Sequence, residues 1–289
     1  MSLGRHFLLN TGAKIPALGL GTWRSEPAEV VTAVKTALAA GYKHVDTAFI
    51  YGNEPSVGDG IEQSPVDRKD IFLTTKLWNS DQQQAEFAFK RSLEHLKTDY
   101  LDLYLMHWPV TLDSSGGVVP ASEWDYIKTW HAMQPLLGSG SSSARAIGVS
   151  NFTIAQLEKL LSHPDTKVVP AANQVELHPH LPQTELLEYC ASKGIHVTAY
   201  SPLGSASGPL LKDVTVTRLA AKYTKTPAQV LISWAIQRGT SVIPKSVTPK
   251  RIISNFDDFL LESQDIKALN DIHEATSQRI VSPPWADYF

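Results

Sequence analysis

Residues 27–46 read PAEVVTAVKTALAAGYKHVD, and this stretch contains one helix followed by one strand. Between Pro27 and Gly41 the apolar residues return every three to four positions, which is the period of a helix that buries one face. A proline suits the first turn of a helix and a glycine suits its end. The short apolar run Tyr42–Asp46 then has the length and composition of a buried strand.

The same alternation of strand and helix signals recurs along the whole chain. Thr153–Gln156 and Thr226–Gln229 each have the spacing of a helix capping box. Gly19-Leu-Gly21 continues without a third glycine, so the fingerprint of an open dinucleotide-binding sheet is absent. Eight strand–helix units therefore favour an α/β fold, a (β/α)8 TIM barrel, with a short N-terminal β-hairpin and a C-terminal tail over the pocket. The expected strands are Ala17–Leu20, Tyr42–Asp46, Ile71–Thr75, Leu101–Met106, Arg145–Val149, Ala172–Val175, Ile195–Tyr200 and Ser241–Ile243.

Composition narrows the class of protein further. The 289 residues are 43% hydrophobic and 19% charged, which is typical of one globular domain, here residues 1–289. The net charge of −3 gives no reason to expect a nucleic-acid or membrane partner. The single cysteine, Cys190, falls in a helical pattern and is interpreted as a small buried apolar residue. No apolar run approaches the ~18 residues of a membrane span, so we expect a cytoplasmic protein, and nothing demands more than a monomer.

Four polar side chains follow consecutive candidate strands. Asp46 ends the second strand and Tyr51 follows it, Lys76 ends the third strand, and His107 ends the fourth. The active site of a TIM barrel lies at these strand ends, so the four should meet. Each one alone is more often structural: a capped strand end, a packed aromatic, a solvated lysine or a core histidine.

Together the four side chains suit the reduction of a carbonyl group. Tyr51 can give a proton to the alkoxide that forms as a hydride arrives. We expect Lys76 to lower the pKa of Tyr51 and Asp46 to hold the lysine in place. His107 is expected to orient the carbonyl oxygen by a hydrogen bond.

The motifs around these residues resemble the aldo-keto reductase family, from about Lys14 to Pro284. The resemblance implies NADP(H) as cofactor and reduction of an aldehyde or ketone, possible in reverse as a polyol or glycerol dehydrogenase. A non-catalytic or regulatory nicotinamide-binding barrel is the alternative, and the complete set of four residues argues against it. The motifs are Gly19-Leu-Gly-Thr-Trp23, Asp46-Thr-Ala48, Tyr51-Gly-Asn-Glu54, Lys76-Leu-Trp78, His107-Trp-Pro109, Gly148-Val-Ser-Asn-Phe152, Asn173-Gln174, Tyr200-Ser-Pro-Leu-Gly204 and Ile243-Pro-Lys-Ser-Val247.

The same resemblance implies where the cofactor binds. Ser150, Asn151 and Gln174 would hold its carboxamide, and the ring of Tyr200 would stack on the nicotinamide. A lysine and an arginine beside a helix start form a strong site for a dianion, here the 2′-phosphate. The implied cofactor-binding set is Gly21, Thr22, Trp23, Asp46, Ser150, Asn151, Gln174, Tyr200, Ser201, Leu203, Gly204, Lys245, Ser246, Val247, Thr248, Arg251 and Asn255.

Aromatic residues crowd the same strand ends and predict an apolar substrate pocket. Two prolines stop the last helix, so residues 281–285 should fold back over that pocket. His178-Pro-His180 lacks a third ligand and predicts no metal site. The expected pocket residues are Trp23, Ile50, Trp78, His107, Trp108 and Trp285.

Two features depart from the family pattern. Only residues 205–214 separate Gly204 from the next helix, where many family members have a long loop. A short segment predicts that cofactor release limits turnover less than in those relatives. Ser254 stands where relatives usually have an acidic residue, which predicts weaker contacts to the adenine end of the cofactor.

Overall fold

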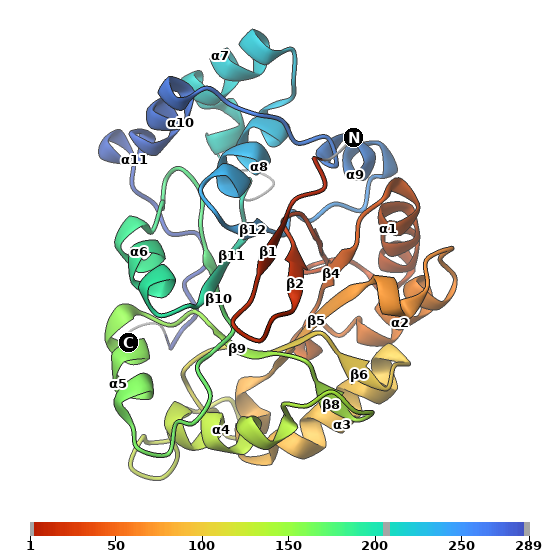
Figure 1. The fold of residues 1–289 in the computed structure, drawn as a ribbon, viewed down its shortest axis with the longest axis vertical. Helices are drawn as coiled ribbons and strands as arrows, with labels where there is room; N and C mark the ends of the chain where they lie inside the picture. Colours follow the sequence, from red (N-terminus) through yellow and green to blue (C-terminus); the bar gives the residue numbers. More distant parts are fainter. Residues whose placement is uncertain (1–2, 205–208, 286–289) are drawn as a thin grey trace.

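The chain folds into a barrel of parallel strands surrounded by helices (Figure 1). The structure, a computed structural model, describes residues 3–204 and 209–285. Its eight-stranded sheet has the order β12-β11-β10-β9-β7-β5-β4-β3, and every neighbouring pair is parallel. The predicted TIM-barrel fold is confirmed. The strands are β3 (Leu20–Gly21), β4 (His44–Asp46), β5 (Phe72–Leu77), β7 (Leu103–Met106), β9 (Ile147–Ser150), β10 (Ala172–Glu176), β11 (His196–Tyr200) and β12 (Ser241–Val242).

The first and last strands of the sheet meet and close the barrel. Leu18 bridges Val242 and Gly21 bridges Lys245, both in the parallel sense. A side chain at Gly21 would place its Cβ 2.7 Å from the carbonyl oxygen of Ile243, so this contact requires glycine. The first strand was predicted at Ala17–Leu20, but the regular ladder covers only Leu20–Gly21, because before it only Leu18 pairs with β12, through one isolated bridge.

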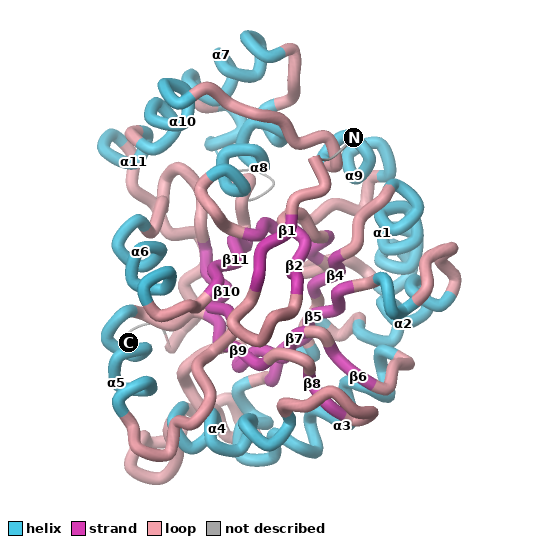
Figure 2. Tube along the Cα trace, in the orientation of Figure 1, coloured by secondary structure: helices cyan, strands magenta, loops and turns pink. Residues whose placement is uncertain are grey.

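The helices form the outer layer, as the tube in Figure 2 shows. Gly41 ends α1 in the left-handed conformation, with φ of 109°, and both predicted capping boxes are present, at α5 and α8. Cys190 in α6 is fully buried, and burial raises the pKa of its thiol to about 11, so it is a core residue. The helices are α1 (Pro27–Ala40), α2 (Glu54–Glu62), α3 (Ala85–Leu96), α4 (Tyr126–Met133), α5 (Ile154–Ser162), α6 (Thr184–Ser192), α7 (Val214–Tyr223), α8 (Pro227–Gln237), α9 (Pro249–Asn255), α10 (Ser263–Asn270) and α11 (Ile272–Ala275).

The N-terminal hairpin lies across one end of the barrel. Its strands β1 (His6–Leu8) and β2 (Lys14–Pro16) are antiparallel and cross the barrel in Figure 1. Ile15, which is fully buried, packs with residues near the start of the barrel strands, such as Phe72 and Ala172. The hairpin therefore closes the amino-terminal end of the barrel and leaves the opposite end for a site. Outside the barrel, β6 (Tyr100–Leu101) pairs with β8 (Ser143–Ala144).

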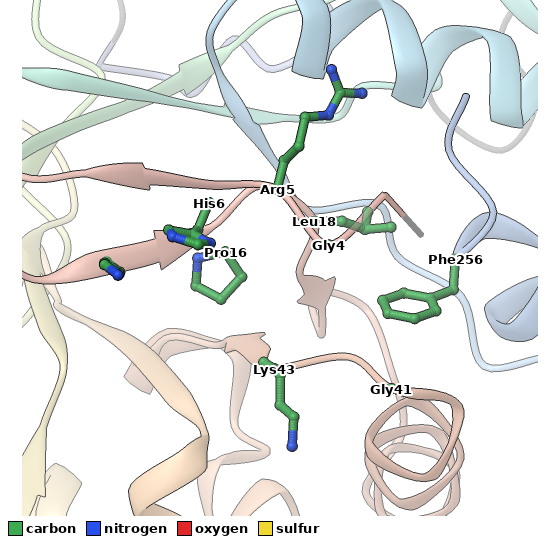
Figure 3. Close-up of a pocket in the computed structure, with 9 residues that line it drawn as sticks. Gly4, Arg5, His6, Pro16, Leu18, Gly41, Lys43 and Phe256 are labelled. Atoms are coloured by element: carbon green, nitrogen blue, oxygen red, sulfur yellow. The ribbon is translucent and has the colours of Figure 1, made fainter. Parts of the chain in front are cut away.

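A cavity of about 260 Å³ lies beside this hairpin (Figure 3). Its basic side chains do not converge, since Arg5 and Lys43 point away from one another in the close-up. Arg5 instead forms an ion pair with the buried carboxylate of Asp258, at 3.0 Å. We therefore interpret this cavity as a packing crevice. Among the described residues, no helix has both the length and the apolar character that crossing a membrane requires.

The closure of the barrel predicts a stability effect. Gly21→Ala should lower the free energy of unfolding by about 1–3 kcal/mol, because the new Cβ meets a backbone oxygen that cannot move away. Urea denaturation followed by fluorescence measures the change. Gly140→Ala is the matched control, since a Cβ there meets no atom within 4 Å, and it should change stability by less than about 0.5 kcal/mol. Equal stability of the two variants would contradict this account of the closure.

Candidate active site

A cavity of about 1010 Å³ lies at the carboxyl ends of the barrel strands. It collects side chains from the ends of β3, β4, β9, β10 and β11 and from the loops that follow them. Every predicted site residue except Lys76 and Gly204 lines it. The structure therefore brings the predicted catalytic, cofactor and substrate residues to one continuous space.

A buried ion pair forms the floor of the cavity. Lys76 Nζ lies 2.6 Å from Asp46 Oδ1, and their side chains are 0% and 2% exposed. The ammonium also donates to the carbonyl oxygen of Thr47, at 2.8 Å, and to the hydroxyl of Tyr51, at 3.4 Å. Gln174 Nε2 donates to the second carboxylate oxygen of Asp46, at 2.7 Å. Lys76 does not line the cavity itself, since its side chain is fully buried, but it contacts Asp46 and Tyr51, which do.

Burial beside Asp46 keeps Tyr51 protonated. Burial is the main cause that raises the pKa of Tyr51 well above 10, and the charge of Asp46 adds to it. We expected Lys76 to lower the pKa of Tyr51, but the net shift in the free protein is upward, because burial and the charge of Asp46 outweigh the ammonium. Burial also raises the pKa of Asp46 and lowers that of Lys76, against their mutual attraction. Tyr51 is consequently a stable proton donor at neutral pH.

His107 lies beside Tyr51 as a neutral imidazole. The ring centroids are 5.8 Å apart in an edge-on arrangement, and the ring of Trp78 lies 5.2 Å away on another side. Burial, and secondarily the charge of Lys76, lowers the pKa of His107 well below 6.5. Its Nδ1 has no hydrogen-bond partner among the described residues. A neutral imidazole offers one N–H, which is what orienting a carbonyl oxygen requires.

A set of polar side chains fixes the middle of the cavity. Ser150 Oγ donates to the carbonyl oxygen of Gln174, at 2.7 Å, and the Tyr200 hydroxyl donates to Asn151 Oδ1, at 2.7 Å. Asn151 and Ser201 both adopt left-handed backbone, with φ of 64° and 50°, directly after β9 and at the end of β11. Left-handed backbone in residues other than glycine is found most often at functional sites. The side chains predicted to hold a carboxamide are thus held in place before any ligand binds.

The far arm of the cavity is basic. Lys245 and Arg251 are both exposed, and neither forms an ion pair within the described part of the chain. Ser246 Oγ accepts a hydrogen bond from the N–H of Thr248, at 3.1 Å, which shapes the turn between them. Two free cations on one cavity wall suit a phosphate group.

The near arm is aromatic. Trp285 lies edge-on to Trp78 and Trp108, with ring centroids 5.9 and 6.3 Å away. Trp23 and Ile50 stand at the rim and are 40% and 45% exposed. The predicted return of the C-terminal tail to the cavity is seen in residues 280–283 and Trp285, which all line it.

Some predicted features are absent from the cavity or lie elsewhere. Gly204, expected along a pyrophosphate, does not line the cavity; its φ is 71° and a Cβ there would lie 2.8 Å from Leu210, so the position requires glycine. Of the short segment 205–214, residues 205–208 lie outside the described part of the chain. His178, considered above as a metal ligand, is fully buried and contacts the Glu176 carboxylate at 2.9 Å.

Sequence reasoning missed several lining residues. Arg24 covers the Trp23 ring at 4.3 Å to its centroid and lines the cavity, yet no motif marks it. Leu211 and the start of α8, residues 226–228, also line the cavity. The Thr226 capping box was visible in the sequence, but only the closed barrel brings that helix start to the site.

Comparison with known proteins agrees with this geometry. The Aldo/keto reductase family profile matches residues 17–274. The chain is 47% identical to aldehyde reductase YPR1 and 47% identical to glycerol 2-dehydrogenase (NADP(+)), both of Saccharomyces cerevisiae, over 97% of this chain and 95% of each relative. The structure of a Bombyx mori aldo-keto reductase in complex with NADP aligns with a TM-score of 0.90 at 37% identity, covering 99% of this chain and 98% of that one.

The buried ion pair predicts a stability loss that depends on pH. Lys76→Met leaves the Asp46 carboxylate unpaired, so the protein should lose about 3–5 kcal/mol at pH 8. The folded-state pKa of Asp46 is already raised and should rise further in the variant, whereas the unfolded value stays near 4. Stability is then lost as pH rises from the unfolded pKa towards the folded pKa, so the deficit should be smaller at pH 5.

Urea denaturation at pH 5 and pH 8 measures this difference. The double variant Lys76→Met/Asp46→Asn should recover most of the stability, because no charge is left buried without a partner. The same loss of stability at both pH values, or no recovery in the double variant, would show that Lys76 does not control the charge of Asp46 at the floor of the cavity.

Proposed function

The chain belongs to the aldo/keto reductase family, and from this premise we propose that it reduces an aldehyde or ketone to an alcohol with NADPH. The observation that carries the proposal is the Tyr51 hydroxyl, which lies 3.4 Å from Lys76 Nζ at the floor of the cavity. Tyr51 acts as the general acid, and Asp46, Lys76 and His107 complete the catalytic set. The bound NADPH supplies the hydride.

Each residue has a distinct task at the carbonyl group. His107 donates its imidazole N–H to the carbonyl oxygen and turns that oxygen towards Tyr51. Tyr51 then gives its phenolic proton to the developing alkoxide. The Lys76 ammonium, held by Asp46, stabilises the phenolate that remains, which is a larger contribution in a buried site than in water. In the oxidative direction the same groups take the proton back.

The cavity residues fit the cofactor of the relatives. The flat ring of Tyr200, fixed by its bond to Asn151, offers a stacking surface for nicotinamide. Ser150, Asn151 and Gln174 supply the polar groups for its carboxamide. Lys245 and Arg251, which are exposed and without ion pairs in the described chain, bind the 2′-phosphate, and Ser246, Val247, Thr248 and Asn255 line the same arm.

The aromatic near arm favours an apolar aldehyde or ketone over a strongly hydrated sugar. This arm is formed by the rings of Trp78, Trp108 and Trp285 and has few polar groups. Burial of apolar surface against these rings therefore stabilises the binding of an aryl or alkyl substrate. The two yeast relatives are named for an aldehyde and for glycerol at the same 47% identity, so identity does not choose the direction. We further propose a monomeric, cytoplasmic enzyme of one domain, since one barrel supplies the catalytic, cofactor and substrate residues together.

Tyr51→Phe tests the general acid. The variant keeps the ring and loses only the hydroxyl, so single-turnover reduction of an aromatic aldehyde should fall by about 100-fold or more, while NADPH binding should stay within about twofold. Stopped-flow absorbance follows the first quantity and quenching of tryptophan fluorescence follows the second.

Two results would contradict the proposal. If Tyr51→Phe reduced the aldehyde at the rate of the unmodified protein, Tyr51 would not be the proton donor. NADPH binding without turnover of any aldehyde, ketone or polyol by the unmodified protein would favour the alternative, a regulatory nicotinamide-binding barrel.

The basic arm predicts a preference between the two dinucleotides. A charge-assisted hydrogen bond contributes about 1.5–3 kcal/mol, so Arg251→Ala should raise the Kd of NADPH about 10- to 100-fold. NADH lacks the 2′-phosphate and should bind almost as before. Lys250→Ala is the matched control, because Lys250 is exposed on the same helix but does not line the cavity. An equal loss of affinity for NADPH and NADH in Arg251→Ala would show that Arg251 does not bind the 2′-phosphate.

A further inference from the structure

The carboxylate of Glu176 is buried at the end of β10 without a lysine or arginine partner in the described chain. The side chain is 0% exposed. A buried carboxylate is costly unless its oxygens accept enough hydrogen bonds. Oε1 accepts from the N–H of Ile280 at 2.7 Å and contacts His178 Nε2 at 2.9 Å, and Oε2 accepts from the N–H of Val281 at 2.7 Å.

Two of these donors belong to the C-terminal segment 277–285, which contains no helix or strand. The segment makes three backbone hydrogen bonds to other described residues, and Glu176 accepts two of them. The third runs from the N–H of Gln278 to the carbonyl oxygen of His180. One side chain therefore provides most of the hydrogen bonding that holds the segment.

The held segment forms the aromatic near arm of the cavity. Residues 280–283 line the cavity, and Trp285 follows with its ring against Trp78 and Trp108. Glu176 itself does not line the cavity. Its effect on a substrate must therefore pass through the segment.

A carboxylate fits this position better than any neutral group. The two backbone N–H groups reach different oxygens, and the imidazole reaches one of them as well. A glutamine has one acceptor oxygen, and its NH2 group would face one of the N–H donors. His178 Nδ1 has no hydrogen-bond partner among the described residues, so Glu176 is the contact that the imidazole makes through its other nitrogen.

We propose that Glu176 is a positioning residue that holds residues 280–285 over the cavity and thereby sets the fit of bulky substrates. This inference rests on the proposed carbonyl reduction for its substrate. A substrate large enough to touch Trp285 depends on the clamp, whereas a small aldehyde that reaches only Tyr51 and His107 does not. Loss of the clamp should therefore change KM for bulky substrates and leave the chemical step unchanged.

Glu176→Gln in the full-length protein tests the clamp in two independent ways. Hydrogen–deuterium exchange of the peptide that covers residues 277–285 should quicken by about tenfold or more, since one amide loses its acceptor and the other keeps only an uncharged one. KM for a bulky aromatic aldehyde should rise by about tenfold, while kcat, and KM for a three-carbon aldehyde, stay within about twofold. Exchange needs no turnover, so its outcome is separate from that of the proposed function.

Two further variants separate positioning from folding. Trp285→Ala should itself raise KM for the bulky substrate, and adding Glu176→Gln to it should have little further effect, because both act through one ring. Asp102→Asn is the matched control: Asp102 is a buried carboxylate that accepts the N–H of Leu73, and it does not line the cavity. It should lower stability without changing the ratio of the two KM values.

Each outcome decides part of the inference. Unchanged exchange in Glu176→Gln would overturn the clamp. Faster exchange with an unchanged KM ratio would overturn its role in substrate fit, and so would full additivity with Trp285→Ala. Rescue of both readouts by Glu176→Asp would support a role for the carboxylate, because that change keeps two acceptor oxygens.

Discussion

Burial of the Lys76–Asp46 ion pair is the constraint on which the catalytic end of the barrel depends. Removing both charges from water costs several kcal/mol for each ion, and only close, complete hydrogen bonding offsets this. Asp46 stands on β4, Lys76 on β5, and Gln174 reaches the same carboxylate from β10 across the barrel. The pair joins two neighbouring strands, but the hydrogen bond from Gln174 that completes it requires the closed barrel, so the site depends on the fold.

The same burial sets the charge of the neighbouring groups. Tyr51 remains a phenol because its hydroxyl is buried beside a carboxylate, and His107 remains neutral because it is buried beside an ammonium. Both states are the ones that a proton donor and a hydrogen-bond donor require. Sequence reasoning could place the four residues at adjacent strand ends, since parallel strands bring their carboxyl ends together. It could not give the pKa direction of Tyr51, because that depends mainly on how deeply the hydroxyl is buried and then on the charge of Asp46.

The parts of the site that the sequence reveals are those with local signals. Alternating strand and helix patterns located eight strands, and glycine and capping signals such as Gly41 and Thr153 located helix ends. Contacts between distant segments carry no such signal. Glu176 lies 104 residues before Ile280, and nothing in either stretch indicates that they meet. Gly204 likewise has a visible motif, but its closeness to Leu210 follows only from the three-dimensional path of the chain.

The net charge of the side chains differs between the two ends of the cavity, and in the proposed reaction this difference orients the ligands. The floor holds a neutralised pair and two neutral donors, while the far arm holds the exposed cations Lys245 and Arg251. A dianionic phosphate is attracted to the far arm and finds no free positive charge at the floor. In the proposed function this directs the nicotinamide end of the dinucleotide towards Tyr200 and leaves the apolar arm under Trp285 for the carbonyl substrate. One closed barrel thus separates a charged ligand from an uncharged one without a second domain.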